Sequence, residues 1–245
     1  MCRVRPRSRR GVTARMPTMN FRSSVPPEAW QDLIARGRRR TFPRGTLLLR
    51  QGESPDSVIA LVEGQVRVTQ LSESGDELVL MLRGPGEVLG EMGALVGQPR
   101  SASVMAARRC TGMVLPAHAF RGYVDRHGFQ DVIYRLTVER LHRHERLRVR
   151  LLHTNRVVRI AIVVSALAEE LGRPEGTTVV VDLGVARAEL AAMASMKRSS
   201  AATALRQLQT DGVLSLTGRR LVVTDPEGLA AAARGEAYGR APDPV

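Results

Sequence analysis

The stretch Gly90-Glu91-Met92-Gly93-Ala94-Leu95-Val96-Gly97-Gln98-Pro99-Arg100-Ser101-Ala102 is the most informative part of this chain. A Gly-Glu step is followed, nine residues after Glu91, by an Arg-Ser-Ala step, and the residues between are mostly small or apolar. A short helical turn here would aim successive backbone N–H groups at one point, which makes an anion cradle. Arg100 would add a forked contact to phosphate oxygens, Ser101 a hydroxyl donor, and Glu91 an acceptor for a ribose hydroxyl. The pattern predicts a site for a compact nucleotide.

This segment resembles the phosphate-binding cassette of cyclic-nucleotide-binding domains. The matching residues are in register without insertion: Gly90, Glu91, Arg100, Ser101 and Ala102. The resemblance implies a cyclic nucleotide effector, cyclic AMP or cyclic GMP, and the ligand-binding residues Gly90, Glu91, Met92, Arg100, Ser101 and Ala102. Two alternatives stay open: a surface loop in which Glu91 and Arg100 only pair with each other, and a degenerate domain that keeps the shape without binding a ligand.

Length and cysteine content narrow the class of protein. A chain of 245 residues can hold two modest domains, each with its own core. Cys2 and Cys110 cannot build a disulfide framework or a four-cysteine iron–sulfur site, which favours a reducing cytoplasm. No apolar run approaches the roughly 18 residues of a membrane span. The basic N-terminal stretch lacks the apolar segment of a signal peptide.

The formal net charge of +13 is unevenly distributed. Residues 1–40 carry a net charge of +9 and residues 185–224 carry +4, whereas residues 41–119, which include the cassette, carry −1. The positive field therefore lies at the two ends of the chain. This predicts a polyanionic partner, nucleic acid before membrane, since no amphipathic anchor accompanies the basic residues.

The first half of the chain predicts a disordered tail and then a β-rich domain. Residues 1–22 have seven Arg and no acid, which is typical of a disordered basic tail, either an arm that holds phosphate or an extension ahead of a start at Met16 or Met19. Short apolar runs then alternate with turn glycines, and predict strands over 46–49, 58–62, 66–68, 78–82 and 102–106. Such spacing indicates a sandwich or barrel, and its order resembles the β-roll of cyclic-nucleotide-binding domains.

Residues 129–155 contain no Gly or Pro and predict a long helix. Apolar residues recur along it at three- to four-residue spacing, at Tyr134, Val138, Leu141, Leu147, Leu151 and Val158. A helix of this kind beside a small domain commonly pairs with its twin in a coiled-coil-like dimer. The alternative is an amphipathic helix packed only on its own domain.

Residues 185–224 form a second module. Two helices are predicted over 186–194 and 197–210, separated near Ser195-Met196, and a β-hairpin follows over 213–224. Two short helices and a β-wing indicate a winged helix-turn-helix. The predicted DNA contacts are Lys197, Arg198, Ser199, Thr203 and Arg206 on the second helix, and Arg219 and Arg220 at the tip of the wing. The alternative is a solvated basic face.

The order β-roll, long helix, winged helix resembles the catabolite activator and Fnr regulators of bacterial transcription, over roughly residues 28–235. The resemblance places Arg198 where the family reads a guanine. Ser199 and Thr203 stand where the commoner recognition helix has Glu and a second Arg, and Ser195 replaces a frequent turn glycine. The base-contacting positions of the long helix fall near His144 and Glu145 rather than a Thr-Ser pair, so the identity of the base stays open.

These observations predict an α+β chain: a disordered basic tail (1–22), a cyclic-nucleotide-binding-like β-roll sensor resembling a double-stranded jelly roll (23–128), a dimerisation helix (129–156), a winged helix-turn-helix domain (157–235) and a flexible tail (236–245). The resemblance implies a homodimeric, cytoplasmic transcription regulator controlled by a cyclic nucleotide, cyclic AMP first. Its expected partners are double-stranded promoter DNA, a second copy of itself and RNA polymerase, and no membrane.

Three other functions stay open. One is a constitutive regulator of the same family, and another is a nucleotide-sensing module that contacts proteins and not DNA. The third is an enzyme, for which no Ser-His-Asp order, paired buried carboxylates or metal-ligand spacing stands out. His142 and His144 are two residues apart and therefore lie on different faces of a helix. The sequence thus assigns no catalytic residue and no metal ligand.

Overall fold

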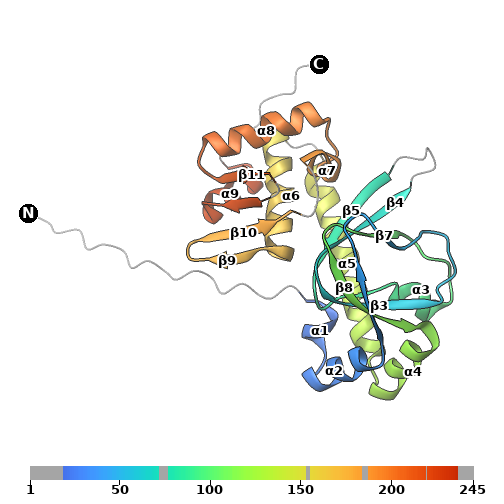
Figure 1. The fold of residues 1–245 in the computed structure, drawn as a ribbon. Coiled ribbons are helices and arrows are strands. Elements are labelled where there is room, and N and C mark those ends of the chain that lie inside the picture. Colours follow the sequence, from blue (N-terminus) through green and yellow to red (C-terminus); the bar gives the residue numbers. More distant parts are fainter. Residues whose placement is uncertain (1–18, 72–76, 153–154, 184–186, 219, 237–245) are drawn as a thin grey trace, which may run out of the picture.

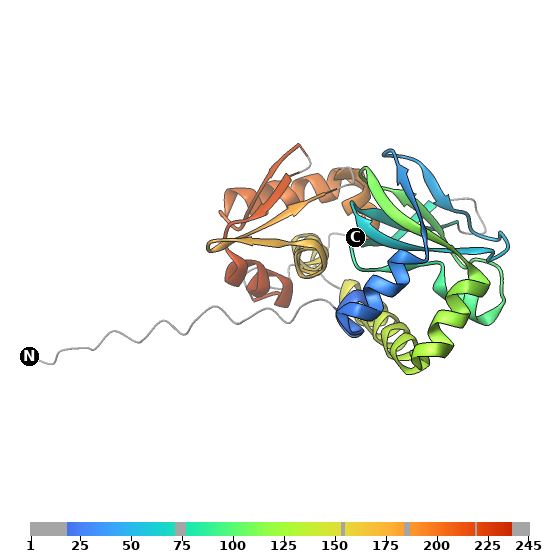
Figure 2. The same cartoon turned by 60° about the horizontal axis from the view of Figure 1, so that its bottom comes forward.

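The computed structural model describes residues 19–71, 77–152, 155–183, 187–218 and 220–236. The chain forms a β-rich N-terminal domain, a long helix and a smaller C-terminal domain of helices and one sheet (Figure 1). In the turned view of Figure 2 the two domains lie side by side, and the long helix runs along one flank of the N-terminal domain. This architecture confirms the predicted α+β class with a β-roll, a long helix and a winged helix-turn-helix.

The folded part of the N-terminal region begins earlier than the sequence indicates. Asn20 caps α1 (Phe21–Ser24), and its side chain accepts a hydrogen bond from the backbone N–H of Ser23 at 2.9 Å. Phe21 is 1% exposed, and its ring centre lies 6.4 Å from that of Trp30 on α2 (Pro27–Ala35). The predicted boundary after residue 22 is therefore wrong, because an aromatic core takes up Phe21. The predicted tail over 1–18 lies outside the described residues.

Two antiparallel sheets face each other in the N-terminal domain. The first has the order β1-β8-β3-β6 and consists of β1 (Arg38–Phe42), β8 (Cys110–Pro116), β3 (Ser57–Glu63) and β6 (Val88–Leu89). The second has the order β2-β7-β4-β5 and consists of β2 (Leu47–Leu49), β7 (Ser103–Ala106), β4 (Val66–Leu71) and β5 (Glu77–Arg83). Apolar side chains from both sheets, Leu61, Val66 and Leu89 among them, fill the space between. The predicted strands over 46–106 are confirmed.

Two helices follow the β-roll. α4 (Ala117–His127) leads into α5 (Gln130–Leu151), which packs on the domain through the buried Val132, Ile133 and Leu136. The predicted helix over 129–156 is too long: α5 ends at Leu151, and Leu152 has extended backbone. Asn155 then caps the next helix by accepting a hydrogen bond from the backbone N–H of Val157 at 2.8 Å. A side-chain acceptor of this kind favours the start of a new helix.

The C-terminal domain is built around α6 (Arg156–Leu171), whose apolar face is buried against the other helices and the sheet. The helices are α7 (Arg187–Met193), α8 (Arg198–Thr210) and α9 (Pro226–Arg234). The sheet has the order β11-β12-β10-β9, from β11 (Leu214–Thr217), β12 (Arg220–Val223), β10 (Thr178–Asp182) and β9 (Arg173–Glu175). The predicted wing is β11–β12, and two strands that sequence reasoning missed extend it.

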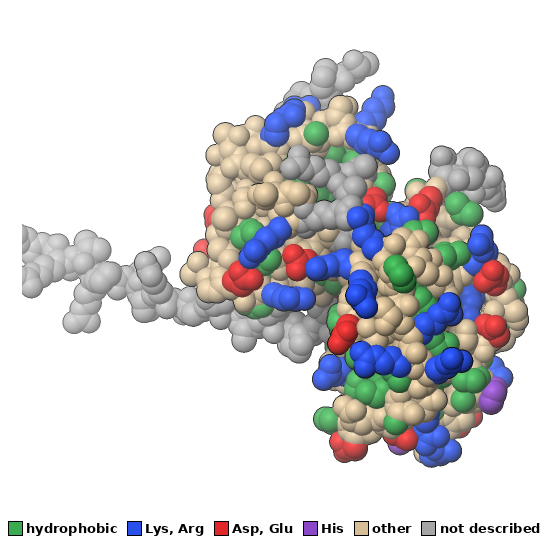
Figure 3. Space-filling view, viewed as in Figure 1, with side chains coloured by type: hydrophobic (Ala, Val, Ile, Leu, Met, Phe, Trp, Pro, Cys, Tyr) green, Lys and Arg blue, Asp and Glu red, His purple; other side chains and the backbone are tan. Residues whose placement is uncertain are grey.

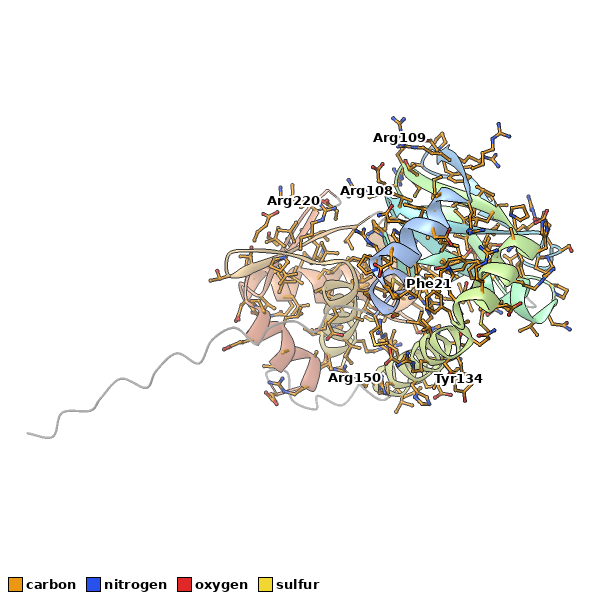
Figure 4. The ribbon with its side chains drawn as sticks, turned by 90° about the horizontal axis from the view of Figure 1, so that it is seen from below. Phe21, Arg108, Arg109, Tyr134, Arg150 and Arg220 are labelled. Atoms are coloured by element: carbon orange, nitrogen blue, oxygen red, sulfur yellow. The ribbon has the colours of Figure 1, made fainter. Side chains whose placement is uncertain are left out.

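The C-terminal domain is docked against the second sheet of the β-roll. Leu82 of β5 is fully buried and belongs to the apolar cluster that also contains Leu167 of α6. Ion pairs cross the junction between Arg83 and Glu170 (3.2 Å), between Arg108 and Asp182 (2.9 Å) and between Arg67 and Glu189. Figure 4 shows Arg108 and Arg220 close together where the domains meet.

Candidate functional site

The cassette is held between two glycines in the left-handed backbone region. β6 ends at Leu89, Gly90 has φ +80°, α3 (Glu91–Val96) follows, and Gly97 with φ +72° ends that helix. A Cβ added to Gly90 would overlap Nη1 of Arg100, so only glycine fits here. The glycine at the start of the motif therefore leaves room for the guanidinium at its end.

Arg100 is a buried cation with one unused donor. Its residue is 6% exposed, and Nη2 donates to the carbonyl of Ser57 at 2.9 Å and to Oδ1 of Asp56 at 3.2 Å. Nη1 is buried and has no hydrogen-bond partner among the described residues. Buried polar groups in folded proteins nearly always have partners, so an acceptor from outside the chain fits this position. A phosphate oxygen supplies such an acceptor.

A cavity of about 260 Å³ lies beside Arg100. This is close to the lower end of roughly 300 Å³ for ligand pockets, a size that suits one small ligand. The sequence-predicted residues that line it are Gly90, Glu91, Met92, Arg100, Ser101, Ala102 and His144. Glu145 is exposed and does not line this cavity, because it follows His144 on α5 and faces away from the β-roll. The helix contributes Thr137, Arg140 and Leu141 instead.

Arg140 is the site residue that sequence reasoning missed. Its Nη1 donates to Oε1 of Glu91 at 2.5 Å, and its Nη2 pairs with Glu87. Burial opposes the charge of Arg140, but the two carboxylates together raise the pKa of its guanidinium above the usual value. The available signal was spacing, since Arg140 lies four residues before His144 and therefore on the same helix face.

Two further groups facing the cavity have unusual surroundings. Nε of Arg140 is buried without a hydrogen-bond partner in the described part of the chain. Burial lowers the pKa of His144, and the nearby positive charges of Arg148 and Arg83 lower it further, which favours a neutral imidazole. A neutral imidazole has one donor and one acceptor nitrogen and can read the edge of a base.

The predicted DNA contacts lie on α8 and the wing. Lys197, Arg198, Ser199, Thr203 and Arg206 are all exposed, on the helix face opposite the buried Ala201, Leu205 and Leu208. Figure 3 shows Lys and Arg side chains standing on the end of the domain over α8. Arg220 is exposed and pairs with Glu175 of β9 at 3.1 Å, and Arg219 lies outside the described residues.

The turn between α7 and α8 contains the one non-glycine residue with positive φ in the described ranges, Ser195 at +52°. Nη2 of Arg159 on α6 donates to the carbonyl of Ser195 at 2.7 Å and fixes the turn to the domain core. The serine that replaces the frequent turn glycine thus still adopts the left-handed conformation that glycine favours.

One face of α5 exposes apolar side chains to solvent. On α5, Tyr134 is 70% exposed, Leu141 56% and Val149 67%, and Leu152 at the C-cap is 60% exposed. We call this set the α5 seam. Figure 4 shows Tyr134 projecting from α5 away from the β-roll. The predicted continuation of the stripe through Leu147, Leu151 and Val158 is wrong, because those residues pack into the C-terminal domain.

The described residues hold no group of three His, Cys, Asp or Glu side chains that is placed to bind a metal ion. In the same ranges, no helix has the length and apolar character that a membrane crossing requires.

Comparison with known proteins matches each domain separately. The family model "Cyclic nucleotide-binding domain" matches residues 39–127, and "Crp-like helix-turn-helix domain" matches residues 158–232. The CRP-like cAMP-activated global transcriptional regulator of Mycobacterium tuberculosis is 26% identical over 211 residues, 86% of this chain and 94% of that protein. The CRP-like protein Clp of Xanthomonas campestris is 28% identical over 78% of this chain and 85% of its own length.

Solved structures show the same fold. FixK2 from Bradyrhizobium japonicum has a TM-score of 0.69 at 18% identity, over 80% of this chain and 96% of that one. The c-di-GMP responsive global regulator CLP of Xanthomonas campestris has a TM-score of 0.61 at 23% identity, over 81% and 99%.

Proposed function

Because the chain belongs to the Crp/Fnr family of bacterial transcription regulators, we propose that it is a homodimeric regulator whose affinity for promoter DNA is set by a cyclic nucleotide bound in the β-roll. The observation that carries the ligand half is the unpartnered, buried Nη1 of Arg100 beside the cavity. A cyclic phosphate would complete its hydrogen bonds, with Ser101 at the rim and Glu91 on the ribose side. The remaining wall, Met92 and His144 among its residues, would face the base.

Cyclic AMP is the first candidate effector, because a relative that covers most of this chain is named for activation by it. A protein of the same fold is named for a response to c-di-GMP, so cyclic AMP is not the only nucleotide to test. His144 sits where the base would lie and is held neutral. Cyclic GMP is the second candidate for the same pocket, since the unpartnered Nη1 of Arg100 would hold its cyclic phosphate in the same way.

A second function has a specific observation in its favour. Glu91, the expected acceptor for the ribose, already has a buried partner in Arg140. A site whose carboxylate is neutralised from within fits a constitutive regulator that needs no ligand. Full-affinity DNA binding in the absence of any nucleotide is the outcome expected for that alternative.

The dimer half of the proposal is supported by the α5 seam, which presents three large apolar side chains of α5 and the C-cap residue Leu152 to solvent. Contiguous exposed apolar surface of this kind marks an interaction site. A second copy of the same helix matches the seam by symmetry, as in coiled-coil dimers. The two copies of α8 would then read half-sites about one helical turn of DNA apart, in the cytoplasm, with RNA polymerase as a further partner at the promoter.

Isothermal titration calorimetry with cyclic AMP and with cyclic GMP tests the ligand half. We expect one of them to bind the wild-type protein, and Arg100→Lys to weaken that binding by about tenfold or more, because an ammonium cannot provide the forked contact. Arg50→Lys is the matched control, since Arg50 is an exposed arginine whose pair with Glu53 lies on the surface. Absence of heat with both nucleotides would refute the ligand half and leave the constitutive alternative.

A further inference from the structure

Five mostly buried charged side chains form a continuous line of ion pairs from the cassette to the C-terminal domain. We call this line the ion-pair chain: Glu91 of α3, Arg140 of α5, Glu87 before β6, Arg83 of β5 and Glu170 of α6. Arg83 and Glu87 are nearly inaccessible, and the side chains of Arg140 and Glu170 are 19% and 16% exposed. The ion-pair chain therefore runs through the interior of the protein, where charges interact more strongly than at the surface.

Arg83 is the residue at which the ion-pair chain crosses from the β-roll to the C-terminal domain. The same nitrogen, Nη1, lies 3.0 Å from Oε1 of Glu87 and 3.2 Å from Oε1 of Glu170. The two carboxylates share one donor atom, so a stronger hold by Glu87 weakens the hold on Glu170. Glu87 also pairs with Arg140. The strength of the ion pair between Glu87 and Arg83 therefore depends on how fully Arg140 neutralises Glu87.

Charge balance makes this competition unavoidable. The ion-pair chain contains three carboxylates and two guanidiniums, so each arginine is shared between two acids. A buried carboxylate that loses its cation costs several kcal/mol, which is why each member is sensitive to its neighbour. A change at Glu91 alters the position of Arg140 and so weakens or strengthens the ion pair between Arg140 and Glu87. That change alters the ion pair between Glu87 and Arg83, and with it the ion pair between Arg83 and Glu170.

We propose that this ion-pair chain couples the cassette to the docked position of the DNA-binding domain, with Glu170 as the residue that receives the signal. The inference rests on the proposed function, because its output is DNA affinity. A nucleotide that binds Glu91 and Arg140 weakens the ion pair between Arg140 and Glu87. Glu87 then pairs more strongly with Arg83, and the C-terminal domain loses its buried ion pair with the β-roll, the one between Glu170 and Arg83. The shift in DNA affinity then follows from the difference in ligand affinity between the docked and released states.

A second ion pair across the same junction provides the contrast. Arg108 and Asp182 pair at 2.9 Å, but their side chains are 47% and 42% exposed, and within the described ranges no ion pair joins them to the ion-pair chain. Removing Asp182 weakens docking without touching the route from the cassette. A comparison of variants at Glu170 and Asp182 thus distinguishes a loss of coupling to the cassette from a general loss of docking between the domains.

A double-mutant cycle in the absence of nucleotide tests the proposal. The readout is the Kd of the full-length protein for a duplex that it selects from a random DNA pool, measured by fluorescence anisotropy at fixed salt. We expect Glu91→Gln to change this Kd at least fivefold when Glu170 is present and less than twofold in a Glu170→Gln background. In the Asp182→Asn background the effect of Glu91→Gln should keep its full size. Distant substitutions without a connection combine to within about twofold.

Each outcome decides the proposal. Equal effects of Glu91→Gln in the wild-type and Glu170→Gln backgrounds, or no effect in either, would overturn it while leaving the proposed function standing. If Glu170→Gln does not fold by circular dichroism, Glu170→Asp replaces it, since the shorter acid keeps the charge but withdraws from Arg83. A wild-type protein that selects no duplex, either alone or with cyclic AMP or cyclic GMP added, refutes the DNA half of the proposed function, and the coupling with it.

Discussion

Nη1 of Arg140 lies 2.5 Å from Oε1 of Glu91, so a cation from the long helix holds the carboxylate of the cassette. Because Arg140 also pairs with Glu87, this one side chain neutralises two buried acids. The pair ties α5, which carries the proposed dimer seam, to the segment that would bind the nucleotide.

The first prediction concerns the stability that this arrangement requires. Arg140→Ala should lower the free energy of unfolding by about 3 kcal/mol, because it leaves Glu87 and Glu91 buried without their cation. Urea denaturation at neutral pH measures the change. Arg135→Ala, at an exposed position of the same helix, should stay within about 0.5 kcal/mol of the wild type. Equal losses for both variants would show that the ion pairs of Arg140 are not responsible.

The second prediction concerns pH and Glu170. Burial raises the pKa of this carboxyl, Glu87 raises it further, and Arg83, Arg143 and Arg140 lower it, with a net upward shift from the ordinary 4.5. The folded state therefore holds a proton that the unfolded state releases, and stability falls as pH rises from 4.5 through the raised pKa. Above that pKa the loss is complete.

Urea denaturation across this pH range, for the wild type and Glu170→Gln, isolates the effect. The stability of the wild type relative to Glu170→Gln should decrease with rising pH and then level off. Titrating groups that do not interact with Glu170 cancel in the difference. A difference that is constant, or that grows with pH, would contradict a raised pKa for Glu170.

The third prediction concerns the turn of the helix-turn-helix. Ser195 has φ +52°, and a left-handed conformation costs a non-glycine residue about 1 kcal/mol or more. Ser195→Gly should therefore raise the free energy of unfolding by up to about 1 kcal/mol, measured by thermal or urea unfolding. The backbone carbonyl that accepts from Arg159 is kept. Ala192→Gly, inside α7, should change stability in the opposite direction, by about 1 kcal/mol.

Local sequence patterns predicted five strands of the β-roll, β2, β3, β4, β5 and β7, but missed β1, β6 and β8. These five strands were accessible because apolar runs alternate with turn glycines. β1 begins with Arg38-Arg39-Arg40, which has no alternation and reads as a charge cluster. It becomes a strand because it pairs with β8, with Arg40 opposite Gly112 and Phe42 opposite Cys110. Tertiary pairing overrides propensity at such a position.

The candidate site also contains residues that the sequence predicted and one that it did not. The cassette was predictable because its glycines, acid and arginine stand at fixed spacing within thirteen residues. Arg140 was not, because it lies 49 residues from Glu91 and meets it only when α5 packs on the β-roll. The same packing turns Leu147 and Leu151 toward the C-terminal domain. A helical stripe gives the period of a buried face, but the partner that covers it depends on the tertiary fold.

The fourth prediction concerns assembly. Val149→Asp places a charge in the C-terminal part of the α5 seam, where the side chain is 67% exposed in the single chain. If two seams pack together, the buried carboxylate disfavours association, and sedimentation velocity should show a shift from dimer to monomer at micromolar concentration. Arg135→Asp, exposed on α5 but about 100° around the helix from Tyr134, should remain dimeric. A wild-type monomer, or identical behaviour of the two variants, would rule out the seam as the interface.

The fifth prediction separates the reading of bases from the holding of phosphates on α8. Arg198 is exposed in the first turn of the helix that would enter the major groove, and Lys197 immediately precedes that turn. A bidentate contact with a guanine is worth about 1–3 kcal/mol. Arg198→Ala should therefore weaken binding to a duplex selected in vitro by that amount, with little change for an unrelated duplex.

Lys197→Ala is the matched substitution, because a lysine acts on phosphate as a point charge. It should weaken binding to both duplexes alike and reduce the slope of log K against log salt by about 1. Fluorescence anisotropy titrations at several KCl concentrations measure both quantities. If Arg198→Ala also weakens the two duplexes equally and changes the salt slope, Arg198 contacts the backbone, and the base-reading residues must be sought among Ser199, Thr203 and Arg206.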